Sequence, residues 1–208
     1  MLPNWFVFVA IAIRLAGGAG YIRSTIKGRA KPNPITWFIW ALTALVAFAA
    51  QITEGVGIQA LMTCALAVGP LIIFCISLRV SRDASHFTFF NVCCGVLAIV
   101  GVILWQATSN ALLAIICSIL ADMCGSLPTV RKAYRDPHGE TALPFLLSIA
   151  SMVITLATIK QWTIAAAAFP AYILCINAVI YGAIAYGHHS LTPVEERKKR
   201  KRYKRDQV

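Results

Sequence analysis

Charged residues are scarce in this chain, and acidic residues are the scarcest. Of 208 residues, 13% are charged, with 19 Lys and Arg but only 8 Asp and Glu, whereas 59% are hydrophobic. A water-soluble domain of this length could not bury so much apolar surface. The shortage of charge therefore excludes an ordinary soluble protein and predicts an integral membrane protein.

The sequence also lacks the motifs of catalysis. It has no glycine-rich phosphate-binding loop of the Walker type, so we expect no ATP-driven pumping. The polar loops are too short for a separate enzyme domain. The seven cysteines all fall in apolar runs, and the adjacent Cys93 and Cys94 have no histidine beside them in their run. We therefore expect no enzyme activity, no cofactor and no metal site.

Long apolar segments make up most of what is present. Seven of them can be read, each near the roughly 20 residues that a membrane helix needs. They are residues 4–24, 34–53, 57–79, 87–107, 110–130, 141–159 and 163–187. Alternating ten-residue segments, the mark of a membrane barrel, are not visible. The sequence predicts an all-α integral membrane protein with seven transmembrane helices.

Basic residues gather on one side of this predicted topology. The loops after the first, third and fifth segments and the C-terminal tail hold 17 of the 19 Lys and Arg residues. Lys160 alone lies on the other side, and Arg14 lies inside the first segment. Because positive loops stay in the cytoplasm, we expect a plasma or inner membrane protein with its N-terminus outside and its C-terminus in the cytoplasm.

The tail, residues 188–208, is the most basic part of the chain. Its positive charge predicts contact with anionic lipid at the cytoplasmic surface. Tyr203 is its only aromatic residue, which disfavours nucleic-acid binding. We expect the lipid bilayer, and no nucleic acid, as its partner; assembly into a homo-oligomer stays open.

The two halves of the chain align with each other. A shift of 105 positions places Lys27 on Lys132, Pro32 on Pro137 and Thr36 on Thr141. A shift of 100 positions places Pro70 on Pro170, Cys75 on Cys175 and Ser77 on Asn177. Chance matches of apolar residues are common, but these polar and proline matches favour an internal duplication.

The duplication predicts an arrangement of three helices, one linker helix and three helices. The expected units are residues 1–80, the linker region 81–109, residues 110–187 and the tail 188–208. One repeat plus the linker makes four spans, so both repeats insert with the same orientation, as parallel repeats about an axis along the membrane normal. We expect a solute cavity between the two triplets.

A proline, Pro128, lies at the inner end of the fifth segment, and the sixth opens with Glu140 and the pair Pro144–Phe145. These short motifs of the second predicted repeat resemble the SWEET sugar transporters and the wider PQ-loop superfamily. Thr129 stands where the glutamine of the PQ motif would fall. The resemblance implies a SWEET-like fold and transport of a small polar solute, sugar-like or another metabolite, by alternating access. A receptor, sorting protein or scaffold of the same fold is the alternative.

Arg14 and Asp122 are the only charged residues deep within apolar segments. An ionised side chain at the bilayer centre costs at least about 2.5–3.5 kcal/mol, so such residues usually face a cavity or each other. We expect them to form a pair across the axis that acts as a gate or as a site for solute or proton coupling. A static ion pair, or Arg14 reaching outward to the membrane surface, would be the structural explanation.

Further polar and aromatic residues are candidates for solute binding. Asn177 and its repeat equivalent Ser77 offer an amide and a hydroxyl, although an interhelical hydrogen bond would explain them equally. Trp37 and Trp40 share a helix face, as an apolar platform for a ring-shaped solute or, the interpretation we favour, as part of the lipid-facing aromatic belt. Weaker polar candidates are Tyr21, Thr43, Gln51, Ser118, Ser148 and Ser151.

Prolines and glycines complete the list of candidates. The prolines predicted to act as gates or hinges, or else as fixed kinks, are Pro34, Pro70, Pro128, Pro144 and Pro170. Three glycines of the first segment, Gly17, Gly18 and Gly20, predict close helix packing.

Overall fold

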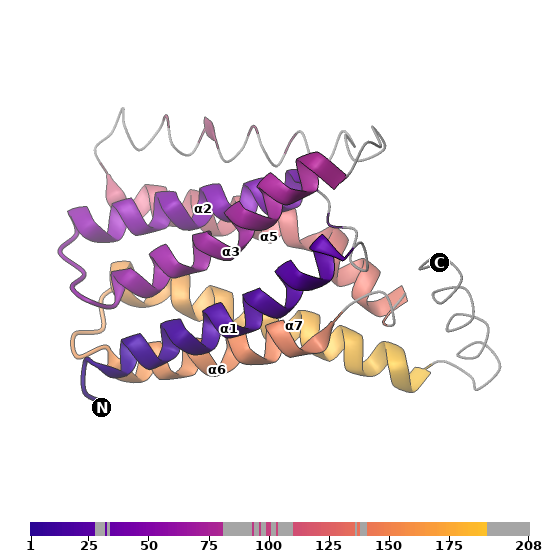
Figure 1. Cartoon of the computed structure of the whole chain (residues 1–208). Coiled ribbons are helices and arrows are strands. Elements are labelled where there is room, and N and C mark those ends of the chain that lie inside the picture. Colours follow the sequence, from indigo (N-terminus) through magenta and orange to yellow (C-terminus); the bar gives the residue numbers. More distant parts are fainter. Residues whose placement is uncertain are drawn as a thin grey trace.

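The computed structural model describes residues 1–27, 32, 34–80, 93, 96, 99, 100, 103, 110–135, 137 and 141–190. Within these residues it contains six helices and no strand (Figure 1). The helices are α1 (Phe6–Ile26), α2 (Pro34–Thr53), α3 (Ala60–Val80), α5 (Ala111–Arg135), α6 (Ala142–Thr158) and α7 (Ile164–Ser190). The predicted linker region 81–109 lies almost wholly outside the described residues, as does the tail from residue 191.

Five of these helices, α1, α2, α3, α5 and α7, are long and apolar enough to cross a membrane, and α6 is a shorter apolar helix. Their outward faces carry large apolar side chains, such as Phe8, Leu45 and Val153, that are about half exposed. Such surfaces suit contact with lipid, because lipid tails need no polar partner. The helices support a multi-pass membrane protein, and six of the seven predicted segments coincide with helices.

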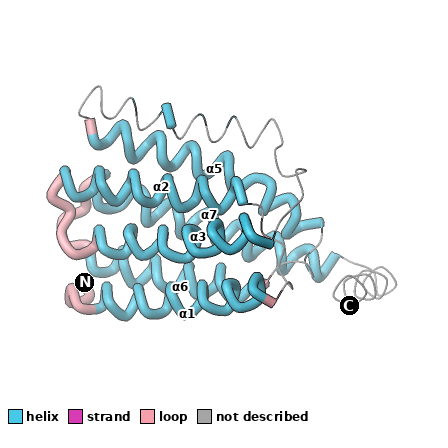
Figure 2. Tube along the Cα trace, turned by 45° about the horizontal axis from the view of Figure 1, so that its top comes forward, coloured by secondary structure: helices cyan, strands magenta, loops and turns pink. Residues whose placement is uncertain are grey.

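The described helices run in two opposite directions along the bundle. Helices α1, α3, α5 and α7 run one way, and α2 and α6 run back (Figures 1 and 2). Backbone N–H of Leu2 donates to the carbonyl of Ala157, which places the start of α1 beside the end of α6. We call this end of the bundle the amino end. The opposite end, which includes Arg23, Arg79 and Lys132 in the last turns of α1, α3 and α5, is the basic end.

The six helices form a closed ring. Helix α1 packs on α3 and α6, α2 packs on α3 and α5, and α7 packs on α5 and α6. The order around the ring is therefore α1, α3, α2, α5, α7, α6, and Figure 2 shows these helices lying side by side. In this order α1 and α5 occupy opposite positions, with the interior of the bundle between them.

Apolar side chains fill the interior at the amino end. One buried cluster there draws on all six helices and includes Met62, Met152 and Phe169, with many alanines between them. A much smaller cluster, centred on Phe145 and Ile180, lies toward the basic end between α5, α6 and α7. The main hydrophobic core therefore seals one end of the ring and leaves the middle and the basic end less densely filled.

Glycines permit close approach at several helix contacts, among them those of α1 with α6 and of α5 with α2. A Cβ atom added at Gly17 would lie 3.2 Å from Cβ of Leu147, where α1 meets α6. A Cβ atom at Gly125 would lie 3.2 Å from Cγ2 of Ile39, where α5 meets α2. The expected close packing is confirmed for Gly17, whereas Gly20 has no neighbouring atom within 4 Å.

The candidate prolines occupy different kinds of position. Pro34 is the first residue of α2, where a missing N–H costs little. Pro70, Pro128 and Pro170 lie inside helices α3, α5 and α7. Pro144 lies within the first turn of α6, whose N–H groups have no helical partners in any case. Pro144 therefore removes no hydrogen bond from the interior of α6.

We expect Gly17→Leu to lower the apparent melting temperature of the detergent-purified protein. The added side chain would overpack the contact between α1 and α6, at a cost of about 1–3 kcal/mol. Gly20→Leu on the same helix is the matched control and should leave the melting temperature nearly unchanged. Equal effects of the two substitutions would contradict the close contact at Gly17.

Candidate functional site

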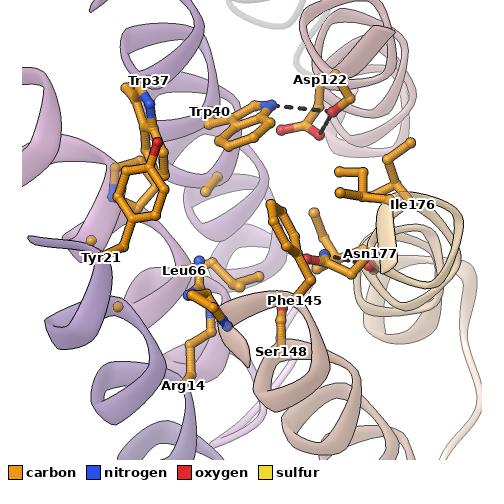
Figure 3. A pocket seen from close by; sticks show the side chains of 18 of the residues that line it. Arg14, Tyr21, Trp37, Trp40, Leu66, Asp122, Phe145, Ser148, Ile176 and Asn177 are labelled. Carbon is orange, nitrogen blue, oxygen red and sulfur yellow. Dashed lines mark hydrogen bonds between the residues drawn. The ribbon is translucent and has the colours of Figure 1, made fainter. Parts of the chain in front are cut away.

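A cavity of about 70 Å³ lies inside the ring. All six helices contribute to its lining, and Arg14 and Asp122 are the charged residues among the lining side chains (Figure 3). The volume exceeds the roughly 10–15 Å³ that one water needs, so the cavity has room for several water-sized groups. Its position supports the expectation of a solute-sized space between the helices.

The cavity lies between the middle of the bundle and its basic end. Tyr21, near the end of α1, and Trp37, in the first turn of α2, belong to its lining. Leu66 and Phe169 belong both to the lining and to the apolar cluster of the amino end. The cluster therefore forms the floor of the cavity on the amino side.

Asp122 is held by hydroxyl groups from three helices. Tyr172 Oη on α7 donates to Oδ2 at 2.7 Å, and Thr43 Oγ1 on α2 donates to Oδ1 at 2.9 Å. Ser126 Oγ, one turn along α5, lies 3.4 Å from Oδ2. The residue is only 4% exposed, so these donors replace the water that a buried carboxyl group lacks.

A tryptophan extends this network. Trp40 Nε1 donates to Ser126 Oγ at 3.2 Å, so the chain of hydrogen bonds runs from α2 through Ser126 to Asp122 (Figure 3). Buried networks of this kind fix side-chain positions when every member has a partner. The carboxyl group of Asp122 and the indole of Trp40 are thus held in place beside the cavity.

Arg14 lines the cavity without pairing with Asp122. Its Nε atom is buried and has no hydrogen-bond partner, and no ion pair joins the two residues. Figure 3 shows them on different sides of the pocket. The expected pair is therefore not formed. Helices α1 and α5 do lie opposite each other, but the cavity separates them, and hydroxyl groups on α2, α5 and α7 satisfy Asp122 instead.

Aromatic rings form one wall of the cavity. The ring centroids of Tyr21 and Trp37 are 4.8 Å apart, and those of Trp37 and Trp40 are 5.0 Å apart in an edge-to-face arrangement. All three residues line the cavity. This placement contradicts the interpretation of Trp37 and Trp40 as lipid-facing belt residues and agrees with an inward platform.

Asn177 and Ser77, which the predicted repeat aligns, have different surroundings. Asn177 lines the cavity, and its Nδ2 donates to the carbonyl of Ile173 at 2.7 Å, which leaves its Oδ1 available. Ser77 is fully buried outside the lining, and its Oγ donates to the carbonyl of Phe74 at 2.7 Å. A short hydroxyl on a helix readily bonds to its own backbone in this way. Ser77 is thus not brought to the candidate site.

The prolines divide in a similar way. Pro70 and Pro144 belong to the lining of the cavity, whereas Pro34, Pro128 and Pro170 do not.

Two residues of the Asp122 network, Tyr172 and Ser126, are not among the site residues that the sequence predicts. A usable signal existed for Tyr172, because tyrosine in membrane helices favours the interfaces and this one lies well inside its helix.

Comparison with family models, with curated proteins and with solved structures found no match for this chain. The side chains that line the cavity, and their arrangement, indicate what the site can bind. An amide, hydroxyl groups, two charged groups and an aromatic wall converge on one small cavity, and such a set suits a small polar ligand.

We expect Tyr172→Phe to lower the free energy of unfolding by about 1–3 kcal/mol, because a buried carboxyl group loses its shortest hydrogen bond. The loss should largely disappear in an Asp122→Leu background, where no acceptor remains. A double-mutant cycle of thermal unfolding in detergent measures this coupling. Equal losses in both backgrounds would show that the hydroxyl does not stabilise Asp122.

Proposed function

We propose that the protein is a membrane transporter that carries a small polar solute by alternating access. The observation that carries this proposal is the cavity inside the ring, which has Arg14 and Asp122 in its lining at mid-bundle depth. Ionisable residues at membrane depth are expensive and usually mark a solute or ion pathway. A scaffold would have no need of them.

The ring supports the predicted duplication. Exchanging α1, α2 and α3 with α5, α6 and α7 leaves the list of main packing partners unchanged. Aligned positions also meet at the cavity: Tyr21 and Ser126 are 105 residues apart, and Ile73 and Ile173 are 100 apart. With the segment 87–107 as linker, this pattern fits parallel triplets in a seven-span protein that resembles the SWEET transporters.

The charge distribution supports an orientation. The last turns of α1, α3 and α5 carry basic residues at the basic end, whereas Lys160 lies at the amino end. By the positive-inside rule the basic end faces the cytoplasm and the N-terminus lies outside. The apolar cluster then closes the outer side, and the cavity lies in the inner half of the membrane.

Side-chain amides join the two triplets at the closed end. Gln51 Nε2 on α2 donates to the carbonyl of Ala165 at 3.1 Å, and Gln59 Nε2 donates to the carbonyl of Thr158 at 3.1 Å. In an outward-open state these bonds would have to break. They are the contacts that would separate when the triplets rock around the cavity.

Solute flux into proteoliposomes tests the proposal. A panel of labelled sugars, amino acids and carboxylic acids identifies a transported solute, and Asn177→Ala should then reduce its flux about tenfold, as expected for one lost hydrogen bond. Ser77→Ala is the matched control, because Ser77 is repeat-equivalent but lies outside the lining. Ligand binding without flux would point to a receptor instead. Absence of both binding and flux would favour a scaffold.

Thiol labelling tests which end of the cavity is open. In a cysteine-free background, a water-soluble maleimide added on the basic side should label Ser148→Cys, which lines the cavity, faster than Ala47→Cys, which lies in the closed cluster. The labelling reaction is run on ice and followed by mass spectrometry. Faster labelling of Ala47→Cys, or labelling of Ser148→Cys from the amino side alone, would contradict an inner cavity closed on the outside.

A further inference from the structure

The polar groups of the cavity are satisfied unequally. Asp122 accepts hydrogen bonds from three hydroxyl groups, whereas Arg14 Nε is buried with no partner. A second orphan atom belongs to the same lining: Ser148 Oγ is buried and also has no partner. Buried polar atoms without partners are uncommon, and each one calls for an explanation.

The two orphan groups lie on neighbouring helices. Arg14 is on α1 and Ser148 is on α6, and these helices pack directly against each other where Gly17 approaches Leu147. Figure 3 shows both side chains on the same side of the pocket, away from Asp122. Within the described part of the chain, no acidic side chain other than Asp122 lines the cavity. The protein therefore offers a cation and a hydroxyl here and no anion to meet them.

The chemistry of the missing partner follows from these two groups. A guanidinium presents several N–H donors in one plane, which match the two oxygens of a carboxylate, and a hydroxyl supplies one further donor. A neutral hydroxyl group of a solute would leave the positive charge of Arg14 uncompensated, which is costly inside a membrane.

We infer that the solute carries a carboxylate, which binds between the Arg14 guanidinium and the Ser148 hydroxyl. This inference rests on the proposed function and names the substrate class. The small volume of the cavity favours a short monocarboxylic acid, and Asn177 and the aromatic wall of Tyr21, Trp37 and Trp40 lie around the remainder of the solute.

The carboxylate could reach Arg14 from two sources. One is solution, through the central cavity. The other is the bilayer, because an almost wholly apolar groove of about 150 Å³ between α1 and α3 also reaches Arg14 and is lined by the half-exposed Leu15, Val68 and Ile72. A fatty acid could enter there with its carboxylate inward. The experiment must therefore separate short acids from long ones.

Thermal stabilisation of the purified protein tests the inference with matched pairs. The probes are acetate, lactate and benzoate, each against its uncharged amide, and decanoate against decanamide. We expect an acid, but not its amide, to raise the melting temperature with concentration, as a ligand specific for the folded state does. Stabilisation by the short acids indicates a soluble solute, and stabilisation by decanoate alone indicates a membrane-borne acid at the same site.

Substitutions identify the side chains that bind the carboxylate. Arg14→Gln should abolish the difference between acid and amide, and without ligand it should melt at the same or a higher temperature, since it removes an unpaired charge from the membrane interior. Arg14→Lys should bind more weakly but keep the preference for the acid, because a lysine keeps the charge without the planar fork. Ser148→Ala should weaken binding about tenfold. Ser77→Ala is the control and should bind as the original protein does.

Either of two results of the thermal assay overturns the inference. One is that no acid stabilises the protein more than its amide, and the other is that the preference survives in Arg14→Gln. Flux measurements distinguish a failure of the carboxylate site from a failure of the proposed transport. Transport of a neutral solute that is unaffected by Arg14→Gln would overturn the carboxylate site and leave transport standing. Binding of acids through Arg14 with no flux of any solute would overturn transport and leave the site standing.

Discussion

A carboxyl group inside an apolar bundle must find hydrogen-bond donors within the protein, and the arrangement of the ring depends on how Asp122 finds them. Thr43 on α2 and Tyr172 on α7 approach the group from the two helices that flank α5. A carboxyl group left without these donors would cost several kcal/mol in an apolar medium. The network therefore fixes the faces that α2, α5 and α7 turn inward, and it bridges the two proposed triplets.

The proposed triplets meet at two interfaces, α2 with α5 and α1 with α6, and these have different chemistry. Each has a glycine at a close contact, Gly125 against Ile39 in one and Gly17 against Leu147 in the other. The first interface carries the satisfied Asp122 network, whereas the second carries Arg14 and Ser148 with orphan atoms. The bundle thus holds one polar site whose groups all have partners and one whose groups do not. The incomplete one has the character of a binding site, because its polar groups still lack partners.

The sequence predicts which residues lie within the membrane better than it predicts which way their side chains point. Apolar runs predicted six described helices, because a run of that composition is stable only as a buried or lipid-facing helix. Charge within such runs was enough to find Arg14 and Asp122 as cavity residues, since neither could face lipid at low cost. Their pairing was not predictable, because spacing along a helix does not give the width of the space between α1 and α5.

The rotation of each helix about its own axis explains the other differences between prediction and structure. Trp37 and Trp40 share one face, but composition alone does not say whether that face meets lipid or the interior; here it meets the interior. Ser77 and Asn177 are aligned by the predicted repeat, and each side chain bonds to a carbonyl of its own helix, yet only Asn177 lines the cavity. Alignment in the predicted repeat therefore does not imply the same role at the site.

The composition of the closed end bears on the proposed motion. Its buried cluster contains about as many alanines, among them Ala47, Ala114 and Ala165, as larger side chains such as Phe169. Small side chains make smooth contacts that interlock little, so two such surfaces can part without a change of many rotamers. Three hydrogen bonds between described residues cross this end, from the side-chain amides of Gln51 and Gln59 and from the backbone N–H of Leu2, and all three run from a neutral amide to a carbonyl. An end held by small contacts and neutral hydrogen bonds suits a gate that must open, because each of those contacts separates at modest cost.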